Sequence, residues 1–68
     1  MRIRVNGSDR DVPAGTTAAD AARLVGVEAS ERGVAVAVGG DVVPRGEWAA
    51  TRLVDGDEIE VVRAAAGG

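Results

Sequence analysis

The sequence predicts a small α+β domain in which one main helix packs on a mixed β-sheet. Three observations predict this class. Alternating polar and apolar residues, which are typical of half-buried strands, lie near both ends of the chain. Twelve valines among 68 residues favour strands, because β-branched side chains fit a pleated surface. Between the two alternating stretches, one alanine-rich segment begins with a helix-capping pattern.

The first twelve residues predict a β-hairpin. Residues 2–6 alternate between arginine and an apolar side chain, as a half-buried strand does. Residues 7–9, Gly-Ser-Asp, predict a tight turn. Residues 10–12 then predict a short returning strand, which Pro13 ends.

The helix is predicted from Thr17 to the glycine at position 26. Thr17 and Asp20 have the spacing of a capping box, and a carboxylate in the first turn interacts favourably with the helix dipole. Small apolar side chains fall on one helical face: Ala18, Ala21, Ala22 and Val25. Because these side chains are small, we expect the helix to lie close to the sheet.

A second hairpin is predicted after the helix. Residues 34–38 are apolar at every position, which predicts a strand that is covered on both sides or interior to the sheet. Gly39-Gly40 permits the positive φ angles of a two-residue turn, and residues 41–43 predict the returning strand.

The rest of the chain predicts one more strand. Residues 45–52 lack a clean period and predict a turn or short helix, which Trp48 anchors in the core. Asp-Gly-Asp at 55–57 is a turn signal, and residues 58–63 alternate again as a strand does.

The first and last predicted strands carry matching patterns, so we expect them side by side. Their apolar residues would then share the buried face of the sheet. Opposite charges would pair across the open face: Arg2 and Arg4 with Glu58 and Glu60.

The composition argues against several classes of protein. The chain has no Cys, His, Lys or Tyr, which argues against an enzyme and against a metal site. A net charge of −3 without a basic cluster argues against a nucleic-acid partner. The longest apolar run, residues 34–38, is too short to span a membrane or to act as a signal peptide. We therefore expect a monomeric cytoplasmic carrier, substrate or binding module that holds no cofactor of its own.

Several stretches, taken in order, resemble a known family: residues 3–7 (Ile-Arg-Val-Asn-Gly), 34–38, 42–45 (Val-Val-Pro-Arg), 47–48 (Glu-Trp), 53–62 and the terminal Gly67-Gly68. Together they resemble the sulfur carrier proteins of thiamine biosynthesis, the ThiS family, which has the β-grasp fold of ubiquitin. The chain departs from this family at Gly39-Gly40, where relatives usually have Asn-Gly. Both pairs tolerate positive φ angles, so the change affects only local rigidity.

The resemblance implies a β-grasp domain at residues 1–63 and a flexible tail at residues 64–68. It implies that an E1-like adenylyltransferase uses ATP and magnesium to adenylate the carboxylate of Gly68. Sulfur that a cysteine desulfurase takes from cysteine then replaces the AMP and leaves a thiocarboxylate. Thiazole synthase accepts this sulfur. The predicted function is therefore that of a carrier and co-substrate, not of an enzyme.

The predicted site is the carboxyl terminus. The tail that threads into the active site of a partner consists of Ala65, Ala66, Gly67 and Gly68. Glycine at the last two positions leaves room for a sulfur nucleophile, and without cysteine the chain must carry sulfur on its terminal carboxyl group. Three residues of the last strand are candidate partner contacts: Glu58, Glu60 and Val62.

Two alternatives keep the same fold. One is the small subunit of molybdopterin synthase, a sulfur carrier with the same activation chemistry. That family typically has a Phe-containing core and a Pro-bearing stretch before Gly-Gly, whereas this chain has no Phe and approaches its end through residues 63–66, Arg-Ala-Ala-Ala. The other alternative is a non-conjugating β-grasp binding module, for which Gly68 would be dispensable. The acidic run at 55–60 fits a solvated turn and strand edge as well as a docking patch.

Overall fold

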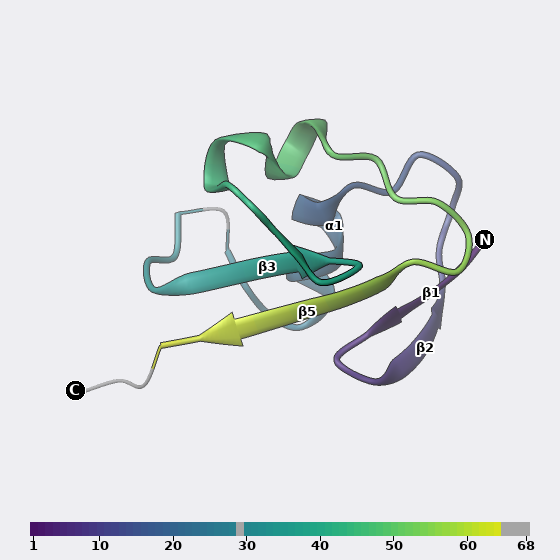
Figure 1. Ribbon diagram of the computed structural model, residues 1–68, viewed down its shortest axis with the longest axis horizontal. Coiled ribbons are helices and arrows are strands. Elements are labelled where there is room, and N and C mark those ends of the chain that lie inside the picture. Colours follow the sequence, from purple (N-terminus) through teal and green to yellow (C-terminus); the bar gives the residue numbers. More distant parts are fainter. Residues whose placement is uncertain (29, 65–68) are drawn as a thin grey trace.

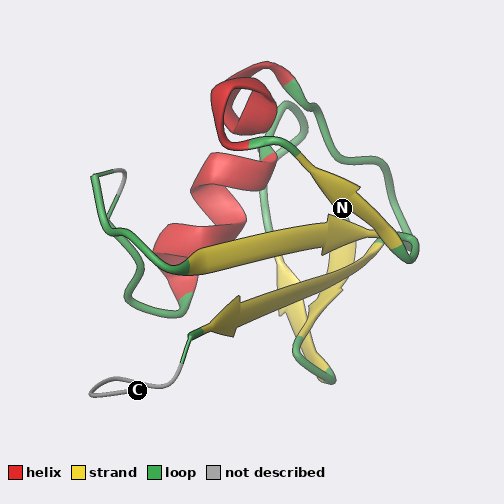
Figure 2. Cartoon of the chain, turned by 60° about the vertical axis from the view of Figure 1, so that its left-hand side comes forward, coloured by secondary structure: helices red, strands yellow, loops and turns green. Residues whose placement is uncertain are grey.

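The computed structural model describes residues 1–28 and 30–64. The elements are, in order, β1 (Arg2–Val5), β2 (Ser8–Asp11), α1 (Ala18–Leu24), β3 (Val34–Val38), β4 (Asp41–Val43), the 3₁₀ helix η1 (Arg45–Ala50) and β5 (Glu58–Arg63). The strands form one five-stranded sheet in the order β2-β1-β5-β3-β4. Helix α1 and η1 cover one face of this sheet (Figure 1, Figure 2). The predicted α+β class is confirmed.

The sheet is mixed because its first and last strands run parallel. β1 pairs with β5 in parallel, whereas β1 with β2, β3 with β4, and β3 with β5 are antiparallel pairs. In the parallel pair Arg4 lies opposite Glu58, and Val5 lies opposite Ile59. The predicted neighbourhood of the first and last strands is therefore confirmed.

The first hairpin turns earlier than predicted. Its turn is Asn6-Gly7, with φ angles of +50° and +83°, so β2 begins at Ser8. Two successive residues at positive φ are what a two-residue hairpin needs, and Asn-Gly is the sequence that supplies them most readily. The side chain of Asn6 also bridges to β5, where it accepts a hydrogen bond from the Val61 N–H at 2.8 Å and donates to the Val61 carbonyl at 3.2 Å.

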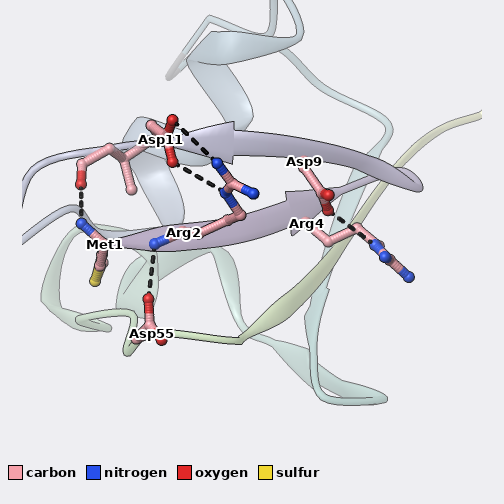
Figure 3. A network of polar contacts seen from close by, with 7 residues as sticks. Met1, Arg2, Arg4, Asp9, Asp11 and Asp55 are labelled. Carbon is pink, nitrogen blue, oxygen red and sulfur yellow. Dashed lines mark hydrogen bonds and ion pairs between the residues drawn. The ribbon is translucent and has the colours of Figure 1, made fainter.

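The predicted pairing of charges between the first and last strands is wrong. Arg2 forms an ion pair with Asp11 at 3.1 Å, and Arg4 forms one with Asp9 at 3.3 Å (Figure 3). Both partners belong to β2, whose register places them directly opposite the two arginines. A turn at residues 7–9 would have shifted this register, which is why the sequence prediction missed these pairs.

The core lies between the sheet and the two helices. Its buried members are Ile3, Val5, Ala18, Ala21, Ala22, Val27, Val36, Trp48, Leu53, Ile59 and Val61. The helix contributes only alanines to this set, so its backbone can approach the sheet closely. The predicted capping box is present, because the Thr17 hydroxyl accepts from the Asp20 N–H and the Asp20 carboxylate accepts from the Thr17 N–H. Trp48 is 4% exposed, which confirms its predicted place in the core.

β3 occupies the interior of the sheet, between β5 and β4. Only Val36 is fully buried in this strand, and Ala35 is exposed on the opposite face. The apolar run predicted a strand that is either covered on both faces or interior to the sheet. The structure shows the second: β3 is an interior strand with one exposed face. Among the described residues, no helix is long and apolar enough to cross a membrane.

Candidate functional site

The carboxyl end of the chain leaves from the central strand of the sheet. β5 has β1 on one side and β3 on the other, and its last residue pairs with the first residue of β3, Val34. The predicted tail residues Ala65, Ala66, Gly67 and Gly68 lie outside the described residues. Ala64 is described, and its N–H donates to the Gly33 carbonyl at 2.6 Å. Contacts with the domain therefore extend one residue beyond the predicted boundary at residue 63.

Arg63 connects the end of β5 to the loop that precedes β3. Its Nε donates to Oε2 of Glu31 at 2.7 Å, and its Nη2 donates to Oε1 of the same carboxylate at 3.3 Å and to the Gly26 carbonyl at 2.9 Å. Hydrogen bonding and the positive charge of Arg63 lower the pKa of the Glu31 carboxyl group. This contact is not predictable from the sequence, because 32 residues separate the partners and no local pattern links them.

Glu31 is also held through its backbone. Its carbonyl accepts a hydrogen bond from the Arg45 guanidinium, which lies over the Trp48 ring at 4.1 Å from the centroid. A cation in this position is attracted by the electron-rich face of the ring. The indole N–H of Trp48 donates in turn to the Val43 carbonyl at 2.9 Å. The contacts of Glu31 therefore link the exit of the chain to a buried aromatic residue.

The open face of the sheet carries an apolar strip across β4, β3 and β5. It consists of Ala35, Ala37, Val42 and Val62. Val62 lies opposite Ala35, and Val42 lies opposite Ala37, so all four share the face that the helices leave uncovered. The two valines are 71% exposed at position 42 and 58% at position 62. Val62, one of the predicted partner contacts, is thus part of a larger apolar surface. The other three residues of this surface were not predicted from the sequence.

The acidic run at 55–60 divides into two pairs with different roles. Asp55 accepts a hydrogen bond from the Arg2 N–H, and Asp57 accepts one from the Val54 N–H, both at 2.8 Å, so these two carboxylates stabilise the turn. Glu58 and Glu60 point to the open face. Within residues 1–28 and 30–64, neither glutamate has an ion pair or a side-chain hydrogen bond.

A hollow of the described surface lies at the other side of the open face. It has a volume of about 460 Å³ and is lined by Arg2, Ile3, Arg4, Asp9, Asp55, Gly56 and Glu58. Its two arginines are already engaged in the ion pairs with β2. The described residues contain no group of three His, Cys, Asp or Glu that could hold a metal ion.

The comparisons with known proteins agree with this arrangement. The sequence model of the ThiS family matches residues 3–68, which include the terminal Gly67-Gly68. The chain belongs to the ThiS family. Members of this family are small sulfur carrier proteins and not catalysts, so the predicted class of a sulfur carrier in thiamine biosynthesis is confirmed.

Two solved structures of a thiamine biosynthesis protein (ThiS) from Geobacter metallireducens are similar to the chain. The crystal structure is 28% identical, with 100% of both chains covered and a TM-score of 0.77. The NMR solution structure is 28% identical, with 100% of this chain and 88% of the other covered and a TM-score of 0.76. This similarity confirms the β-grasp fold. A search of curated proteins found no match.

Proposed function

We propose that this ThiS-family chain carries sulfur as a thiocarboxylate on Gly68 and delivers it to thiazole synthase. The observation that carries the proposal is the family match, which runs through the last residue of the chain. The position of β5 supports it, because a central strand gives the terminus a rigid base. Since the activation consumes ATP, we place it in the cytoplasm.

The chemistry begins with the terminal carboxylate. A carboxyl terminus has a pKa of about 3.3–3.7, so it is ionised at neutral pH and can act as a nucleophile. One of its oxygens would attack the α-phosphorus of ATP in the site of an E1-like adenylyltransferase, and pyrophosphate would leave. Magnesium bound to that enzyme would neutralise the phosphate charge. A sulfur nucleophile supplied through a cysteine desulfurase would then attack the carbonyl carbon and displace AMP.

The end of the sequence suits this role. Gly67 and Gly68 have no side chains that would block the approach of a nucleophile to the terminal carbonyl carbon. The four residues that follow Ala64 can span at most about 13–14 Å. Such a length suffices for the terminus to enter a confined site while the domain stays outside.

We propose the apolar strip, together with Glu58 and Glu60, as the surface that docks on these enzymes. Burying the strip would remove exposed valine surface from water, which is the main favourable contribution to association. The two glutamates lie next to it without partners of their own in the described structure. The matching surface would therefore be apolar with basic residues around it, because complementary charges raise the rate of encounter.

Mass spectrometry of the intact protein tests the proposal. The chain is incubated with an E1-like adenylyltransferase, ATP, magnesium and a sulfur source, next to a control chain that lacks Gly68. We expect the full chain to exchange one oxygen for one sulfur at its last residue and the control to stay unchanged. No such exchange, or an equal exchange in the control, would overturn the proposal. Transfer of the sulfur to a molybdopterin synthase large subunit and not to thiazole synthase would assign the chain to the other pathway.

A further inference from the structure

We propose that the contacts of Arg63 and Ala64 with the loop before β3 form a clamp that fixes the direction in which the tail leaves the domain. The clamp consists of Arg63 and Ala64 on one side and of Gly26, Glu31 and Gly33 on the other. Within it, Arg63 and Glu31 are positioning residues, because they act on the Gly68 carboxylate through the backbone between them. This inference rests on the proposed function. It adds residues outside the tail that affect how well the activating enzyme binds the carrier.

The clamp holds two successive residues by different means. The Arg63 side chain makes a two-point contact with the Glu31 carboxylate at 2.7 and 3.3 Å and reaches the Gly26 carbonyl at 2.9 Å. The backbone N–H of Ala64 donates to the Gly33 carbonyl at 2.6 Å. A two-point contact fixes the orientation of a guanidinium group as well as its position. The chain is therefore held up to the last residue before the tail.

The loop side of the clamp is itself supported. The Glu31 N–H donates to the Glu28 carbonyl at 3.0 Å, and the Glu31 carbonyl accepts from Arg45, which lies over the buried Trp48. The clamp is therefore connected to the core, although most of its members are exposed. The loop and the end of β5 lie at the same end of the sheet in Figure 1.

Gly33 allows the two backbones to come close. Its φ angle is +73°, and a Cβ atom placed on it would be 3.3 Å from the Cβ atom of Ala64. A side chain at this position would therefore strain the loop and press on Ala64. Glycine is thus strongly favoured where the loop meets the end of β5.

The expected effect of the clamp follows from chain entropy. A partner that takes up the tail must order every residue that is free before binding. Fixing the backbone of one residue corresponds to a factor of roughly 5 to 30 in an equilibrium constant. The clamp already orders Ala64 in the free carrier. The entropic cost of ordering this residue therefore does not weaken the binding of the carrier to the activating enzyme. Loss of the clamp should raise the KM of the activating enzyme for the carrier and leave the rate at saturation unchanged.

Glu31→Gln in the full-length chain tests the inference. This change removes the charge of the acceptor, and Glu28→Gln is its matched control, because Glu28 lies exposed in the same loop and its side chain has no hydrogen bond or ion pair with a described residue. The measurements are ATP–pyrophosphate exchange by an E1-like adenylyltransferase against carrier concentration, and hydrogen exchange of the Ala64 amide. For Glu31→Gln we expect a KM higher by about 5- to 30-fold, an unchanged rate at saturation and a faster exchange of the Ala64 amide. Glu28→Gln should behave as the parent chain.

A charge reversal separates a clamp from a direct contact with the enzyme. The double variant Glu31→Arg with Arg63→Glu restores an ion pair in the opposite sense and should recover most of the KM. A KM raised equally by both Gln variants, no recovery in the double variant, or an unchanged Ala64 exchange rate in Glu31→Gln would each overturn the clamp.

The parent chain separates failure of the clamp from failure of the proposed function. If the parent chain supports no ATP–pyrophosphate exchange, the proposed function fails. If it does, and Glu31→Gln matches it in KM, only the clamp fails. Thermal unfolding of every variant, with assays run below the lowest midpoint, keeps a folding defect from imitating either result.

Discussion

The open face of the sheet has two halves that differ in how their charges are satisfied. In the paired half, formed by β2 and β1, both arginines have carboxylate partners on the neighbouring strand: Arg2 with Asp11 and Arg4 with Asp9 (Figure 3). In the unpaired half, formed by β5, β3 and β4, the apolar strip is exposed and two glutamates have no partner among the described residues. Both halves face solvent, but only one has its charges neutralised within the protein.

This difference indicates which half is suited to docking. A partner that covered the paired half would have to desolvate four charged groups that already have their partners, which is unfavourable. The same pairs place two aspartates, Asp9 and Asp11, along β2, an edge strand, where charged side chains discourage association with other strands. Covering the unpaired half would bury exposed valines and could give ion-pair partners to Glu58 and Glu60, which form no ion pair among the described residues. That half also contains β5, the strand that leads to the terminus.

The largest expected effect concerns Asn6, which joins the paired half to β5. Asn6→Ala should lower the free energy of unfolding by about 2–4 kcal/mol, because it removes two hydrogen bonds and places a Cβ-bearing residue without a polar side chain at positive φ. Asn6→Gly keeps the favoured φ and removes only the hydrogen bonds, so its loss should be smaller. Urea denaturation of both variants measures the difference. If both variants lost the same free energy of unfolding, the positive φ angle at position 6 would not contribute to the difference between them.

A charge placed in the unpaired half should impair docking without affecting the fold. We expect Val62→Asp to raise the KM of the activating enzyme for the carrier by about 10- to 30-fold, which exceeds the roughly 1 kcal/mol that most interface residues contribute. Val54→Asp is the matched control, because Val54 is 63% exposed but lies outside the sheet. Enzyme kinetics and thermal unfolding of both variants make the test. Equal effects on KM would contradict a docking role for the strip.

A smaller effect is expected when a charge of the paired half is reversed. Arg4→Glu should lower the free energy of unfolding by about 0.2–1 kcal/mol, the usual range for an exposed ion pair. Asp9→Arg in the same chain should recover part of this loss, because it restores the pair in the opposite sense while the new glutamate still lies opposite Glu58. Glu60→Arg should not, since Glu60 lies opposite Ala37 and not opposite Arg4. Denaturation of the two double variants decides the matter, and recovery through position 60 would contradict the observed pairing.

The smallest effect is a dependence of stability on acid pH. Arg2 lowers the pKa of Asp11 through a hydrogen bond and its charge, and the Thr17 N–H lowers the pKa of Asp20. A carboxyl group whose pKa is lower in the folded state stabilises the fold above its unfolded pKa and loses this contribution as the pH falls through the folded value. We therefore expect thermal midpoints to be constant from about pH 5.5 to 7, where a chain without histidine has no side chain of ordinary pKa to titrate, and to fall below about pH 4. Asp11→Asn should reduce that fall, and an unchanged fall would contradict the role of this pair.

Most elements could be predicted from the sequence, because they depend on the chemistry of neighbouring residues. The capping box of Thr17 and Asp20, the Gly39-Gly40 hairpin and the alternation in residues 58–63 depend on neighbouring residues, and each lies where it was predicted. The prediction of the first turn was wrong because Gly-Ser-Asp was preferred to Asn6-Gly7. The stronger signal for a two-residue hairpin was present in the sequence.

The sequence by itself determined that the chain belongs to the ThiS family, because that identity depends on several short stretches and on their order along the chain. Only the tertiary structure decided which charges pair, which valines share a face and what holds the start of the tail. Arg63 and Glu31 are 32 residues apart, and Ala35 meets Val62 only through the antiparallel register of two strands. Contacts of this kind depend on register and loop geometry. A one-residue shift of a strand turns each of its side chains to the opposite face, and the apolar run of β3, which does not alternate, does not by itself exclude that shift.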